Sequence, residues 1–114
     1  MISPGTVGTS SSGGATIVVV GGNSTIGSGS KSVTTAGSRV QLSVASVPCK
    51  KLIIQSTFAN TGNTYVGDVT VSSTVGLVMY PGAATSFTLT PNNLNLIYID
   101  SAVSGEGVTY YYEQ

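Results

Sequence analysis

The sequence predicts an all-β fold, either a β-sandwich or jelly-roll-like domain or a small barrel, with an extended N-terminal arm. Short runs in which apolar and polar residues alternate with a period of two recur from residue 39 to residue 113, as they do in half-buried strands. Gly, Pro and Asn separate these runs and are typical of turns. No window of helical length has an apolar stripe of period 3.6, so we expect little or no helix.

The first 37 residues are expected to form a flexible or partner-bound arm, and residues 38–114 the β domain. Residues 1–14 are dominated by Ser, Thr and Gly and contain too little apolar surface to offset the entropy cost of ordering them. Residues 15–20, ATIVVV, are β-branched and can form a strand only if something covers them. Low-complexity sequence follows as far as Gly37, with a weak alternation over residues 31–35.

Alternation also sets the strands expected inside the domain. In the first of them, Val40, Leu42 and Val44 face one side and the polar residues between them face the other. Residues 60–63, Asn-Thr-Gly-Asn, predict a hairpin or tight loop, and Pro81-Gly82 predicts a type II turn. We expect strands at residues 39–44, 51–57, 64–67, 69–80 with a break at Gly76, 86–90, 96–101 and 108–113.

Charged groups are scarce. The chain has four acidic and four basic side chains, a net charge of zero and 7% charged residues. It therefore lacks the basic field that attracts nucleic acid or an anionic membrane, and no apolar run is long enough for a signal sequence or a membrane span. We expect neither nucleic acid nor membrane as a partner, and near-zero net charge favours self-association.

Groups that carry catalysis or bind metals are equally rare. There is no His, and a lone Cys49 can form no internal disulfide and has no base to activate it. Each of the four carboxylates lies at a strand end or turn, where a single acid usually accepts hydrogen bonds from loop N–H groups; they are Asp68, Asp100, Glu106 and Glu113. No Asp-x-Asp cluster or P-loop spacing occurs. We expect no enzyme, cofactor or metal.

The C-terminal tyrosine triplet has two faces. Tyr110 and Tyr112 share one face of the last strand and are expected in the core, whereas Tyr111 faces the other way and is expected to contact another subunit or a glycan. No Lys or Arg follows Lys51, although these residues commonly protect sheet edges against pairing with other chains. Assembly with other chains would remove that liability.

Residues 48–113 carry a pattern of short motifs. A Pro-Cys-Lys strand opening leads to NTGNTYVGD at residues 60–68, then to a Pro-Gly turn, to NLNLIYID at residues 93–100 and to SGEGVTY at residues 104–110. In this pattern the chain resembles small virion structural proteins of tailed bacteriophages, most closely capsid decoration (cement) proteins or head fibres. The resemblance does not cover the first 40 or so residues, and it implies no catalytic residue.

The resemblance implies a protein of the phage head surface, assembled in the host cytoplasm, that binds the major capsid protein and stabilises the capsid lattice as a homotrimer. The alternative is a tail, baseplate or fibre module that binds host-surface glycan. Residues expected at the capsid or subunit interface lie in the arm, the loop around residues 60–65 and the last strand: Ile2, Ser3, Thr6, Val7, Thr16, Ile17, Val18, Val19, Val20, Asn60, Thr61, Asn63, Tyr65 and Tyr111.

Overall fold

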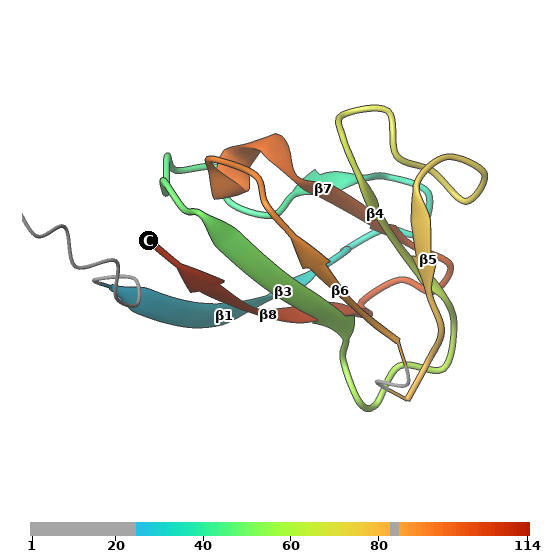
Figure 1. The fold of residues 1–114 in the computed structure, drawn as a ribbon. Helices are drawn as coiled ribbons and strands as arrows, with labels where there is room; N and C mark the ends of the chain where they lie inside the picture. The colour runs from blue at the N-terminus through green and yellow to red at the C-terminus, as the bar shows by residue number, and fades with distance from the viewer. Residues whose placement is uncertain (1–24, 83–84) are drawn as a thin grey trace, which may run out of the picture.

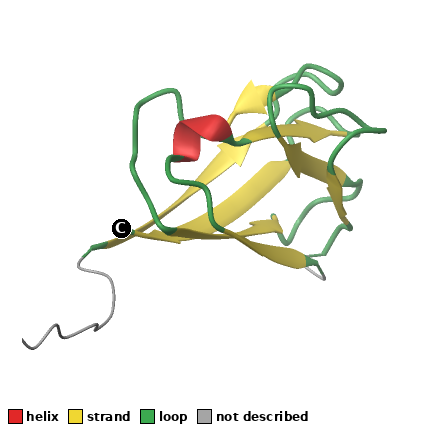
Figure 2. Cartoon of the chain, turned by 45° about the horizontal axis from the view of Figure 1, so that its top comes forward, coloured by secondary structure: helices red, strands yellow, loops and turns green. Residues whose placement is uncertain are grey.

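The structure is a computed structural model that describes residues 25–82 and 85–114. In these residues the regular structure is β except for one short 3₁₀ helix, η1, at Leu94–Leu96 (Figure 2). The strands are β1 (Ile26–Ser32), β2 (Val40–Gln41), β3 (Lys51–Ser56), β4 (Thr64–Gly67), β5 (Leu77–Met79), β6 (Ser86–Leu89), β7 (Tyr98–Ser101) and β8 (Gly107–Glu113).

The strands form two antiparallel sheets of four, ordered β1-β8-β3-β6 and β2-β7-β4-β5 (Figure 1). Four of the pairings are nested in the sequence: β1 with β8, β2 with β7, β3 with β6 and β4 with β5. The first and the last strand of the described chain therefore lie side by side. The all-β prediction is confirmed. Neither sheet closes into a barrel, so the small-barrel alternative does not apply.

The core lies between the two sheets. Leu52, Ile54 and Val108 come from the first sheet, and Met79 and Ile99 from the second; all five are fully buried in one cluster. Burial alternates along β3, as the period of two in its sequence predicts. Burying a side chain of this size contributes on the order of 1.5–3 kcal/mol, so this layer is a large source of apolar stabilisation.

The N-terminal boundary of the domain differs from the expected one. We expected residues 1–37 to be a strand-poor arm, but Ile26–Ser32 form β1, which pairs with β8 along its whole length, and Val33 is fully buried. The glycines of β1 explain why the sequence does not predict this strand, because its inward positions 27 and 29 carry no apolar side chain. A Cβ atom at Gly29 would lie 2.7 Å from the Tyr110 hydroxyl oxygen, and Gly27 faces Tyr112 in the same way, so rings from β8 occupy the places of absent side chains.

Of the two alternatives expected at residues 60–63, a hairpin or a tight loop, the hairpin is not formed. β3 and β4 belong to different sheets, so this loop crosses between the sheets. The hairpin is instead β4–β5, in which Thr64 lies opposite Met79. The loop between β4 and β5 contains the first part of the strand expected at residues 69–80. In this loop Val71 is buried, but Val69 and Val75 are exposed.

Two other strands are shorter than expected. The run over residues 39–44 reduces to Val40–Gln41, and Val44 is 78% exposed. The run over residues 96–101 begins in η1, whose N-cap Asn93 accepts a hydrogen bond from the Asn95 N–H. Gly82 has a φ of 83°, the positive value that a Pro-Gly type II turn needs.

A substitution at Gly107 tests how closely β1 and β8 must approach. A Cβ atom there would lie 2.7 Å from Ser32 Cα and would also overlap the Lys31 carbonyl oxygen. Because these are backbone atoms, we expect Gly107→Ala to lower the free energy of unfolding by about 3 kcal/mol or more, measured by urea denaturation. Gly67→Ala is the matched control, since its Cβ would meet nothing nearer than 3.4 Å; equal losses in the two variants would contradict the close approach.

Candidate interaction surface

Three of the four carboxylates accept hydrogen bonds from backbone N–H groups of loops. Asp68 accepts from Thr70, and Asp100, which is buried, accepts from Gly37 and Ser101. Glu106 accepts from the N–H groups of Thr61 and Gly62 at 2.8 and 3.0 Å. The role expected for lone acids at strand ends and turns is therefore confirmed for these three, which hold loop backbone in place.

Asn60 and Glu106 together fasten the crossing loop to the start of β8, and we call this pair the loop latch. The buried Asn60 side chain donates through Nδ2 to the Gly107 carbonyl at 2.7 Å and accepts from the Gly107 N–H at 3.4 Å. Glu106 Oε2 also accepts from the Thr61 hydroxyl at 2.8 Å. The hydrogen bonds to Gly62 and Thr61 hold the pKa of the Glu106 carboxyl below its ordinary value of 4.5.

The latch changes the interpretation of the predicted contact residues near it. Asn60 and Tyr65 are each 8% exposed, so their side chains belong to the interior rather than to a free surface. Thr61 is exposed but is bonded to Glu106. The carbonyl of Asn63, which is half-buried, accepts from the Ala102 N–H.

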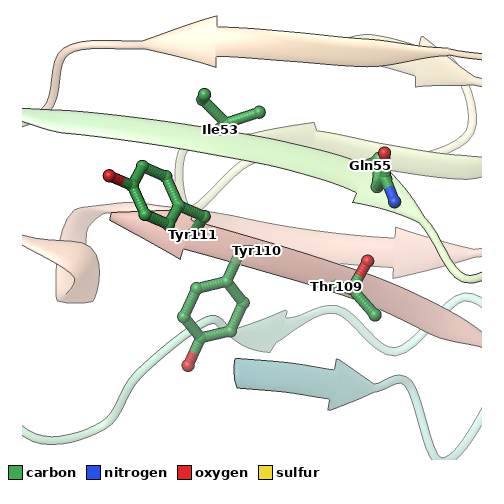
Figure 3. Close-up of a pocket in the computed structure, with 5 residues that line it drawn as sticks. All are labelled: Ile53, Gln55, Thr109, Tyr110 and Tyr111. Carbon is green, nitrogen blue, oxygen red and sulfur yellow. The ribbon is translucent and has the colours of Figure 1, made fainter. Parts of the chain in front are cut away.

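Tyr111 lies on the outer face of the first sheet. Its hydroxyl donates to Glu113 Oε2 at 2.7 Å, and this hydrogen bond is the main cause that raises the pKa of the Tyr111 phenol. The ring borders an open depression of about 270 Å³ that Ile53, Gln55, Thr109 and Tyr110 also line, and Figure 3 shows the Tyr110 and Tyr111 rings pointing in different directions. Tyr111 is thus on an accessible face, as expected, whereas the other lining residues were missed.

Those missed residues follow from strand register. Ile53 lies opposite Tyr111, and Gln55 lies opposite Thr109, in the β3–β8 pair. The alternation of β3 in the sequence puts Ile53 and Gln55 on one face, but it does not say which strand lies beside them. Tyr111 lies four positions after Gly107, or about 13 Å along a strand, so the latch and the depression are separate places on β8.

The inward-facing residues agree with the sequence analysis. Tyr110 and Tyr112 pack against the core, with ring centroids 6.3 Å apart. Cys49 is buried, its Sγ contacts the Pro91 carbonyl oxygen at 3.2 Å, and burial raises the pKa of the thiol. Both the tyrosine and the cysteine predictions are confirmed.

The described surface exposes several large apolar side chains. Phe58 is 81% exposed and Tyr80 58%; Ser56, at the end of β3, donates to the Tyr80 carbonyl. Others lie around the β4–β5 loop and elsewhere: Ile26, Val44, Val69, Val75, Leu77, Leu96 and Val103. The arm residues predicted at an interface, Ile2, Ser3, Thr6, Val7 and Thr16 to Val20, lie outside the described residues.

Residues 25–82 and 85–114 are the part of the chain that the structure describes. No group of three or more His, Cys, Asp or Glu side chains is placed there to hold a metal ion. No helix in this part of the chain is long and apolar enough to cross a membrane. Comparisons with protein-family models, with curated proteins and with solved structures find no match to the chain.

Removing the latch amide tests its contribution to stability. Asn60→Ala deletes both hydrogen bonds to Gly107 in a buried place, so we expect the free energy of unfolding to fall by about 1–3 kcal/mol, measured by urea denaturation. Asn63→Ala is the control, because Asn63 bonds through its main chain. A loss no larger for Asn60→Ala than for Asn63→Ala would show that the latch contributes nothing.

The latch also predicts a dependence of stability on pH. Because the Glu106 pKa is lower in the folded state, its stabilisation is present above about pH 4.5 and is lost as the pH falls through the folded-state pKa. Glu106→Gln should therefore lower the Tm at pH 7, and the difference from the unmodified protein should shrink as the pH falls below 4. A difference that stays constant from pH 7 to pH 3 would exclude this role for the carboxylate.

Proposed function

We propose that this chain is a capsid decoration (cement) protein of a tailed bacteriophage, which binds the outer surface of the head as a homotrimer and stabilises the capsid lattice. The observation that carries the proposal is the nested pairing of eight strands in two antiparallel sheets. We interpret this order as a jelly roll, a topology that recurs in viral capsid and lectin domains. The motif pattern of residues 48–113 supports the same choice.

The described surface is consistent with assembly. Three carboxylates are engaged with loop backbone, and no basic side chain follows Lys51, so little charge opposes contact between copies. Side chains such as Phe58 and Leu77 are exposed and would be covered by a neighbouring protein. The four edge strands, β1, β6, β2 and β5, offer backbone groups for strand addition.

The mechanism that we propose is mechanical. Each copy would bridge neighbouring capsomers, burying on the order of 800 Å² per partner if the contact is of standard size. The N-terminal residues, from Ile2 onward, would reach the capsid subunits. Many copies on one shell would together resist internal DNA pressure even where each contact is weak.

The second candidate is a tail, baseplate or fibre module that binds host glycan. The depression beside Tyr111 favours it, because an accessible aromatic ring with Gln55 and Thr109 nearby can stack on a sugar and donate hydrogen bonds to it. The chain contains no Trp, the residue with the largest face for such stacking. This candidate therefore ranks second.

Binding to virus particles separates the two functions. Purified protein should co-sediment saturably with heads stripped of it, at a copy number that matches lattice positions, and should not co-sediment with tails. Deleting residues 1–22 should abolish head binding and leave the β domain folded by circular dichroism, because β1 begins at Ile26. Gln55→Ala is the control: Gln55 is exposed and lies in the depression beside Tyr111 but is not among the residues expected at the capsid, and this variant should still bind heads.

Other outcomes would redirect the assignment. Binding to tails or host cells that Tyr111→Ala abolishes would overturn the decoration function and favour the glycan module. Unchanged head binding by the truncated protein would move the interface from the N-terminal residues to the β domain.

A further inference from the structure

The outer side of β1 is an open sheet edge. Among the described residues β1 pairs with β8 alone, and it is the point at which the first 24 residues enter the domain. Its exposed side chains are Ile26, Ser28, Ser30 and Ser32, none of them charged. Lys31, the one charged residue of β1, is half-buried and lies after Ser28. The stretch from Ile26 to Ser28 has neither a charge nor a proline and is a ready template for another strand.

The hydrogen bonds to β8 determine which peptide groups of β1 are open. The Thr25 carbonyl accepts from the Gln114 N–H at 2.8 Å, and the Val33 N–H donates to the Glu106 carbonyl at 2.8 Å. Backbone N–H and C=O groups alternate sides along an antiparallel strand, so those of the odd-numbered residues of β1 point toward β8. The N–H and C=O groups of Ile26 and Ser28 therefore point away from the sheet.

A suitable strand precedes this edge in the same chain. Residues 15–20, ATIVVV, are the longest β-branched run in the sequence. Gly22-Asn23 follows and suits a two-residue type II′ hairpin turn, which places Gly at its first central position. A hairpin closed by this turn pairs Gly21 with Ser24.

The turn and the open peptide groups require the same register between residues 15–20 and β1. Continuing from Gly21 and Ser24, Val19 falls opposite Ile26 and Ile17 opposite Ser28. These are the even-numbered β1 residues whose backbone groups point outward. A turn centred one residue earlier, on Gly21-Gly22, would instead close on Asn23 and would require the odd-numbered residues of β1, whose backbone groups face β8, to bond the new strand. The two requirements, from turn chemistry and from the β1–β8 hydrogen bonds, are independent.

We propose that residues 15–20 form a fifth strand on the open edge of β1 in the same chain, with Val19 paired to Ile26 and Ile17 paired to Ser28. The Val19 side chain then covers Ile26, which is 63% exposed without it. Val18 falls beside Gly27 on the inner face, next to the ring of Tyr112. A short connection makes this pairing local and entropically cheap. Residues 1–14 alone remain to reach a partner.

Two neighbouring proline substitutions in the full chain test the register. Val19→Pro removes an N–H that donates to Ile26, whereas Val18→Pro removes an N–H on the solvent side of the new strand, where proline is tolerated. We expect the Ile26 and Ser28 amides to exchange hydrogen at least about tenfold faster in Val19→Pro than in the unmodified protein and in Val18→Pro. Exchange at Ile54, in the centre of β3, should be unchanged and reports that the domain is folded.

Every other outcome overturns the proposal. Fast exchange at Ile26 and Ser28 in the unmodified protein would mean that the edge is open. Slow exchange that is lost on dilution would assign the strand to a second copy. Equal effects of the two prolines would exclude this register. The measurement uses isolated protein and does not depend on the proposed function.

Discussion

The close backbone approach at Gly107 is the contact on which most of this structure depends. A Cβ atom there would overlap the Lys31 carbonyl oxygen, so β8 can lie close enough to pair with β1 only because residue 107 has no side chain. The Gly107 carbonyl also accepts from the Thr57 N–H at 3.0 Å and from Asn60 Nδ2. One residue therefore joins β1, β8 and the loop that crosses from the first sheet to the second.

Polar groups in this protein serve mainly to hold backbone. The buried Asp100 fixes the chain at Gly37 before β2, Glu106 fixes the crossing loop, and Asp68 fixes the start of the β4–β5 loop. A small domain with short strands has many loop N–H groups, and a buried N–H without a partner costs more free energy than a hydrogen bond contributes. Using the few carboxylates in this way leaves a described surface with little charge.

The first sheet offers two candidate contact sites, its open edge at β1 and its outer face around Tyr111. The open edge of β1 offers peptide groups in a fixed register, whereas the face around Tyr111 offers an aromatic ring with amide and hydroxyl neighbours. The first suits pairing with a strand and the second suits a ligand with many hydroxyls. The two places are neighbours, because Ser28 of β1 lies opposite Tyr111 of β8.

The sequence by itself determined the all-β class, most of the strands from Lys51 onward and the inward side of the tyrosine triplet, because a period of two needs no knowledge of partners. It also indicated that lone acids at turns accept loop N–H groups. Only the tertiary structure decided that Ile26–Ser32 is a strand, since its inward positions are glycines covered by rings from β8. The same holds for Asn60: a loop pattern looks alike whether it closes a hairpin or crosses between sheets, and the burial of Asn60 against Gly107 depends on a residue 47 positions away. Tyr65 is buried in β4, which lies between β5 and β7, an order that the sequence does not indicate.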